Sequence, residues 1–240
     1  MSRWKRFWHA VLHGVGDDQP AVHHADDGEH RDTPQQPTLR WLSDSESPFG
    51  IAVLDCRPLT QNLVAASESA EIAARFGQLR TWLGEGLSDQ RFSTEVPVPD
   101  GLRYPTKGVA PPDGPVFKAS AMEEKWDLYL RGGGLYFVRS WTGETCYAAQ
   151  ISWDSDAWRI TQAWQAEAVK DDVQWSMQVI DYLIKSHLYN LAAPHPLRVA
   201  FRGDNEKLAL ASFADFGWRA LYGTFDDLIS SAALEKKLWG

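Results

Sequence analysis

The sequence predicts an α+β fold, in which an antiparallel β-meander of about five strands (residues 116–164) is backed by helices. From residue 116 to residue 164, short runs rich in Tyr, Trp, Val, Ile and Leu alternate with clusters of Gly, Asp or Ser. Such a pattern is typical of strands joined by tight turns. Helical periodicity follows, most clearly over residues 171–189, and no strand–helix–strand unit is repeated.

The composition is that of an ordinary globular protein. Of the 240 residues, 44% are hydrophobic and 23% are charged, and the net charge is −8. No run reaches the ~18 apolar residues that a membrane-spanning helix needs. The acidic balance argues against nucleic-acid binding, which requires a basic surface, and favours a protein partner, including a basic one. Cys56 and Cys146 lie far apart in the sequence, which predicts two reduced thiols in a cytoplasmic protein.

An amphipathic helix is predicted at residues 1–14. Its apolar residues follow the spacing of a single helical face and are Trp4, Phe7, Trp8, Val11 and Leu12. A helix this short is marginal alone, so this face must dock on something. The protein's own body, a partner protein and a membrane surface all remain open.

Residues 15–38 are predicted to form a flexible acidic linker, because Asp, Glu, Gly, Pro and Gln dominate and few residues could anchor a core. Several histidines fall in or before this segment, but neither their spacing nor the absence of nearby cysteines fits a closed zinc site. Neither a metal nor a cofactor is predicted. Residues 39–240 are predicted to form a single α+β domain.

Within that domain, the predicted elements begin with a short strand in 48–58, a helix at 67–83 and an edge strand in 92–98, inside a proline-rich loop. The meander strands are placed at 116–122, 125–131, 134–141, 145–153 and 157–164. The remaining elements are helices at 171–189, 205–216 and 226–238 and short strands at 197–201 and 218–222. Gly132 to Gly134 should form a hairpin turn rather than a phosphate loop, because no helix follows it.

Arg139 is the most distinctive candidate for a functional residue. The period of two places it between Phe137 and Trp141 on an otherwise apolar strand face. There it could bind a carboxylate or phosphate between aromatic walls, or form an internal ion pair with a residue such as Asp127 or Glu144.

The other predicted ligand or partner contacts are Tyr136, Trp141 and His195. Between two prolines, His195 is expected to lie exposed in a loop. No familiar catalytic motif occurs, so no catalytic residue is predicted. Cys56 could act as a nucleophile with His187 or His195 as its base, but the mostly apolar run around Cys56 favours a buried structural thiol.

Three segments stand out together: P-F-G-I-A-V-L-D-C-R-P at 48–58, K-W-D-L-Y-L-R-G-G-G-L-Y-F-V-R-S-W-T-G at 125–143, and V-I-D-Y-L-I-K-S-H-L-Y-N-L-A-A-P-H-P-L at 179–197. With them the chain resembles a group of uncharacterised bacterial proteins over roughly residues 40–200. The resemblance implies a bacterial origin and one continuous domain. It implies no activity and no site residue.

The leading hypothesis is a non-enzymatic protein-binding module of the accessory or immunity type. The acidic charge and the twelve tryptophans support it, because tryptophan is common at interfaces as well as in cores. One alternative is a small-molecule-binding or hydrolytic domain with a pocket near Arg139. Another is a peripheral membrane protein anchored by the N-terminal helix.

Overall fold

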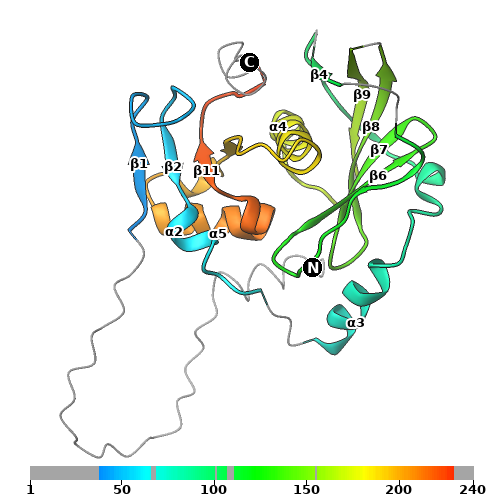
Figure 1. The fold of residues 1–240 in the computed structure, drawn as a ribbon, viewed down its shortest axis with the longest axis horizontal. Helices are drawn as coiled ribbons and strands as arrows, with labels where there is room; N and C mark the ends of the chain where they lie inside the picture. Colours follow the sequence, from blue (N-terminus) through cyan, green and yellow to red (C-terminus); the bar gives the residue numbers. More distant parts are fainter. Residues whose placement is uncertain (1–37, 66–68, 101, 107–110, 155, 230–240) are drawn as a thin grey trace, which may run out of the picture. The chain divides into compact units, whose positions relative to one another are not determined.

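The computed structural model describes residues 38–65, 69–100, 102–106, 111–154 and 156–229. They form two β-sheets and several helices, which confirms the α+β class (Figure 1). The predicted helix at 1–14 lies outside the described residues, as does the predicted linker except for Thr38.

The larger sheet contains the predicted meander and has the strand order β3-β9-β8-β7-β6-β5, with β4 also paired to β9. Its strands are β3 (Thr94–Val96), β4 (Arg103–Pro105), β5 (Gly114–Phe117), β6 (Trp126–Arg131), β7 (Gly134–Arg139), β8 (Thr145–Trp153) and β9 (Ala157–Gln165). All its pairings are antiparallel. Gly132 and Gly133 form the tight turn between β6 and β7 with φ of +56° and +76°, as the sequence predicted.

The smaller sheet is not predicted by the sequence. It has the order β1-β2-β11-β10 and consists of β1 (Arg40–Leu42), β2 (Val53–Asp55), β11 (Tyr222–Thr224) and β10 (His195–Pro196), the last two parallel. The described residues thus form eleven strands in two sheets, not one meander of about five. Strands of two or three residues are too short to show a period of two, which is why the strands predicted at 197–201 and 218–222 are displaced.

The helices are α2 (Arg57–Thr60), α3 (Ala70–Leu79), α4 (Val173–Leu183) and α5 (Asn205–Phe216), with a π turn at Ile184–Leu188 and 3-10 turns at Leu87–Asp89, Val199–Phe201 and Gly217–Arg219. Ser69, Asp172 and Asp204 cap α3, α4 and α5 by accepting a backbone N–H. Residues 226–229 are not helical, and the rest of the helix predicted there lies outside the described residues. Among the described helices, none combines the length and apolarity needed to cross a bilayer.

The main core lies between the larger sheet and α4, which also contacts β10 of the smaller sheet (Figure 1). Tyr147 and Ile160 face this core as predicted, but Trp164 does not. The register between β8 and β9 shifts at Gln150 and Ile151, so Thr161 is a bulge and Ala163 takes the inward position instead.

An ion pair lies inside this core. Lys185 Nζ is 2.7 Å from Asp181 Oδ2, and both side chains are almost completely buried. The Tyr104 hydroxyl donates to Asp181 Oδ1 at 2.9 Å. Burial raises the pKa of Asp181, and the partners offset that desolvation. The pair therefore joins α4 and its π turn to β4.

The chain turns sharply where α5 ends. Gly217 has φ of +66°, and a Cβ added there would lie 1.6 Å from the carbonyl oxygen of Glu123. The same oxygen accepts the N–H of Trp218 at 3.2 Å. Only glycine fits this close approach.

Gly217→Ala is expected to lower the free energy of unfolding by ~3 kcal/mol or more, because it adds a collision with backbone to a strained φ. Gly86→Ala is the matched control, since Gly86 has φ of +77° but nothing within 4 Å of its added Cβ. The control should lose only ~1 kcal/mol. Urea denaturation measures both, and equal losses would contradict the proposed contact.

Candidate functional site

Arg139 anchors α5 to the larger sheet. Its side chain is 9% exposed, and Nη1 and Nη2 donate to the carbonyl oxygens of Asp215 and Ala214 at 3.0 and 2.9 Å. Its guanidinium lies 4.6 Å from the centroid of the Trp126 ring. The last carbonyls of a helix lack intrahelical partners and favour a positive charge, so Arg139 satisfies a buried helix end.

The predicted position of Arg139 on the apolar face is confirmed, because the neighbouring Phe137 belongs to the main core. Asp127, one of the carboxylates considered as its partner, lies on the opposite face of the sheet and pairs with Arg80. Arg139 thus has a structural role in the described contacts.

A second arginine completes this junction. Arg198 Nε and Nη2 donate to the Asp215 carboxylate at 2.9 and 3.1 Å, and Nη1 donates to Asp171 at 2.5 Å. Trp126 Nε1 donates to the Asp215 carbonyl at 2.7 Å. The network joins the larger sheet, α5 and the segment just before α4.

Trp141 lies beside the same junction and forms part of a cage around a lysine. Its Nε1 donates to the Met122 carbonyl at 2.6 Å. Lys125 Nζ donates to that carbonyl at 2.9 Å and lies 4.3 and 4.8 Å from the ring centroids of Trp141 and Phe213. The rings stabilise the ammonium, but burial and then the charge of Arg139 outweigh them and lower the pKa of Lys125 to about 7.

The expectation that His195 is exposed is wrong. His195 belongs to β10, is completely buried, and packs between the rings of Tyr182 and Phe216. Burial lowers the pKa of His195 to about 4. Because β10 pairs with β11, a strand replaces the loop predicted from the flanking prolines.

Tyr136 lies on the other face of the larger sheet from Arg139, so the four predicted contact residues do not converge. It packs, together with Trp82, against a small cluster of Leu87, Tyr129 and Val138. The predicted docking residues of the N-terminal helix, Trp4, Phe7, Trp8, Val11 and Leu12, lie outside the described residues.

Cys56 has the features of a structural thiol. It is fully buried, burial raises its pKa to about 12, and its Sγ lies 3.6 Å from the Leu54 carbonyl. His187 is buried too, and burial lowers its pKa well below the usual value. A thiol that stays protonated is a poor nucleophile. Within the described ranges, no group of three or more His, Cys, Asp or Glu could hold a metal ion.

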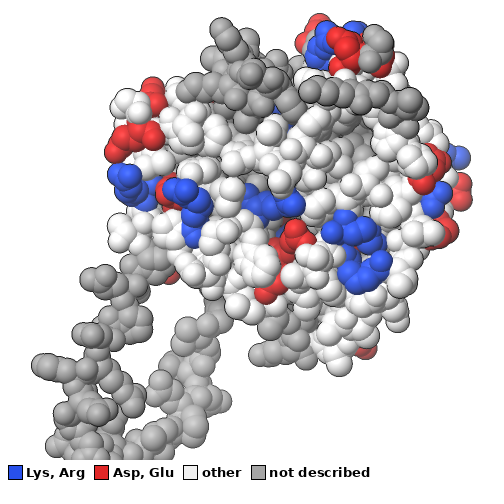
Figure 2. Space-filling view, in the orientation of Figure 1, with Lys and Arg blue, Asp and Glu red and all other residues white. Residues whose placement is uncertain are grey.

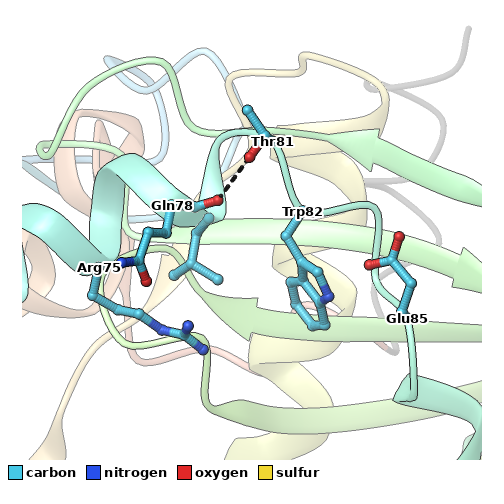
Figure 3. A pocket seen from close by; sticks show the side chains of 6 residues that line it. Arg75, Gln78, Thr81, Trp82 and Glu85 are labelled. Atoms are coloured by element: carbon cyan, nitrogen blue, oxygen red, sulfur yellow. Dashed lines mark hydrogen bonds between the residues drawn. The ribbon is translucent and has the colours of Figure 1, made fainter.

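A surface groove lies on α3 and the turn after it. Its volume is about 480 Å³, and it is lined by Arg75, Gln78, Leu79, Thr81, Trp82 and Glu85. Arg75 and Glu85 lie at opposite ends with the Trp82 ring between them (Figure 3). The groove therefore combines an aromatic wall with a cation at one end and a carboxylate at the other.

A buried ion pair fixes this segment to the sheet. Arg80 Nη1 and Nη2 donate to the two carboxylate oxygens of Asp127 at 3.0 and 2.7 Å. Asp127 is completely buried and also accepts the N–H of Ala119 at 2.7 Å. A bidentate arginine–carboxylate pair fixes orientation as well as distance, so α3 has a defined position on this face.

Two further cations hold the turn that carries Trp82. Lys118 Nζ donates to the carbonyls of Leu79 and Trp82 and to the Tyr129 hydroxyl. Arg131 Nη2 donates to the Leu83 carbonyl at 2.7 Å. The carbonyls at the end of α3 and in its turn are thereby satisfied, which orders the groove.

Sequence reasoning missed this groove. The available signal was the pair Trp82 and Leu83, two large apolar residues in a turn just before Gly84. The cations that fix the turn come from β6 and from the segment after β5, so the sequence alone does not bring them together.

Comparison with protein-family models, with curated proteins and with solved structures finds no match to this chain.

Arg139→Met is expected to destabilise the fold by ~3 kcal/mol, because it removes two donors from buried carbonyl oxygens. Arg103→Met is the control, since Arg103 pairs with Asp156 at the exposed surface and should change stability by less than ~1 kcal/mol. Thermal and urea unfolding compare the two variants. If both lost equally little, Arg139 would have no anchoring role.

Lys125→Met should change how stability depends on pH. Between pH 7 and 10.5 the unfolded chain holds a proton on Lys125 that the folded chain has lost, so wild-type stability rises with pH over this interval. The gain of wild type over the variant should approach ~1.4 kcal/mol per pH unit. Urea denaturation at pH 7, 8 and 9 measures it, with the exposed Lys207→Met as control. A difference that stays constant with pH would refute the lowered pKa.

Proposed function

We propose that this protein is a non-enzymatic protein-binding module and that the groove formed by residues 75–85 is its contact surface. The observation that carries the proposal is the presence of Arg75 and Trp82 side by side on a segment whose backbone is fixed from behind. Trp and Arg are the residue types most enriched among the residues that dominate binding energy at interfaces.

The form of the groove favours a polypeptide over an enclosed small molecule. Its six lining residues all come from one continuous stretch of chain, so they form a wall with an open side (Figure 3). The neighbouring Leu83 is 51% exposed and extends the apolar surface. An interface typically has such an apolar centre with a polar rim, here Gln78, Thr81 and Glu85.

The ordered backbone of this segment also supports a role in binding. A surface that is already ordered loses less conformational entropy when a partner binds. The cations Arg80, Lys118 and Arg131 hold the segment through carbonyls and a buried carboxylate. Binding energy is then not spent on ordering the turn.

The distribution of charge agrees with a protein partner. Figure 2 shows Lys and Arg in small groups separated by acidic and uncharged side chains on the face it presents. Nucleic-acid sites gather basic residues into one continuous patch or stripe. We place the module in the bacterial cytoplasm, which is supported by the two free thiols Cys56 and Cys146.

Photo-crosslinking in the cells that naturally produce the protein tests this function. With p-benzoylphenylalanine in place of the exposed Thr81, irradiation should give adducts of polypeptide size. The same label in place of Glu206, exposed on α5, should not give those adducts.

Adding Leu83→Asp to the Thr81-labelled protein should remove the adducts, because a carboxylate would replace the exposed apolar side chain that adjoins Trp82. Leu83 is half exposed, so this change should leave the fold intact. The proposal fails if no protein adduct forms at position 81, or if the adducts at positions 81 and 206 are the same.

A further inference from the structure

We infer that the partner segment at this groove is acidic, placing an apolar side chain against Trp82 and a carboxylate on Arg75. This inference rests on the proposed function and names the chemistry of the partner. Three features of the groove carry it: the open guanidinium of Arg75, the local excess of cations and the order of the groups along the groove.

Arg75 is an exposed arginine whose guanidinium N–H groups are accessible to a partner. Its Nε is 3.4 Å from the Thr142 carbonyl, and it forms no ion pair within the part of the chain that the structure describes. Figure 3 shows its guanidinium extended at one end of the groove. The planar guanidinium matches the two oxygens of a carboxylate, so a carboxylate is the group that Arg75 binds best.

The charges around the groove favour an acidic partner. Counting residues 75–85 and the side chains bonded to them, there are four cations: Arg75, Arg80, Lys118 and Arg131. There are two carboxylates, Asp127 and Glu85. Asp127 is fully buried against Arg80, so the exposed part of this set is positive. Glu71, one turn before Arg75 on α3, and Glu144, which accepts the Thr142 hydroxyl beside Arg75, reduce this potential.

The order of groups gives the partner a direction. Glu85 lies at the end opposite Arg75, and its Oε2 accepts the N–H of Leu83 at 3.3 Å. A carboxylate beside Glu85 would be repelled, whereas one beside Arg75 would be attracted. The acidic residue must therefore flank the apolar side chain on one side only.

The charges at the groove thus favour a different partner from the basic one that the overall composition favours. A chain with a net charge of −8 favours a basic partner at long range. At contact distance the charges that matter are those within about one Debye length, roughly 8–10 Å. Among residues 75–85 and the side chains bonded to them, the cations outnumber the carboxylates.

A displayed library of random dodecapeptides, selected on the immobilised full chain, tests the inference. The enriched peptides should carry Asp or Glu on one side of Leu, Ile, Phe or Trp. As synthetic labelled peptides, they should bind Arg75→Glu at least ~10-fold more weakly than wild type, because an attractive charge pair at the exposed end of the groove becomes a repulsive one. Exchanging the peptide's acidic residue for Lys should restore binding to Arg75→Glu. Arg103→Glu, a charge reversal on β4, is the matched control and should bind like wild type.

The outcomes separate this inference from the proposed function. Peptides that depend on Trp82, shown with Trp82→Ala, but bind Arg75→Glu as well as wild type would overturn the acidic partner and leave protein binding at the groove. Enrichment of Lys or Arg, or no enrichment at all, would also overturn it. The proposed function itself fails only through the crosslinking at position 81.

Discussion

The buried C-terminal end of α5 is the constraint on which the arrangement of the two sheets depends. Its last carbonyl groups have no partner within the helix, and leaving each of them buried and unpaired would cost free energy comparable to a lost hydrogen bond. Arg139 and Trp126 of the larger sheet donate to them, while Arg198 binds the side chain of Asp215 and, through Asp171, the segment before α4. Arg198 lies two residues after β10, and β11 follows α5, so the same contacts tie these two strands of the smaller sheet to the larger sheet.

Cationic side chains also satisfy the carbonyl groups at other helix ends in the described chain. Lys118 donates to the Leu79 carbonyl at the end of α3, and Arg219 donates to the Ser186 carbonyl in the π turn after α4. Arg139 does so for α5. In each case a long cationic side chain from a distant segment satisfies carbonyls that would otherwise need water or a glycine cap. The protein therefore uses buried and half-buried cations chiefly to dock helices, which explains why the charged residues of its interior do not converge on one site.

The sequence predicts those parts of the fold that local periodicity determines. Strands β6 to β9, the glycine turn and the face on which Arg139 lies all follow from spacing alone. The partners of Arg139 do not, because they are about 75 residues away in the sequence. Likewise, a single bulge moves Ala163 into the core in place of Trp164, and no local pattern reports it. The groove was beyond prediction for the same reason, since Lys118 and Arg131 reach it from other strands or loops.

Arg139 and Arg75 show how burial separates a structural arginine from one suited to recognition. A buried guanidinium must have its donors satisfied within the fold, and Arg139 donates to two main-chain carbonyls. An exposed guanidinium has no such requirement, so Arg75 can keep donors for a partner at little cost in stability. Arg75 also stands on a segment whose backbone Lys118 and Arg131 hold in place beside Trp82. A fixed backbone that carries unsatisfied exposed donors contributes little to the stability of the fold but is well suited to binding, and this distinguishes the groove from the arginine-rich junction.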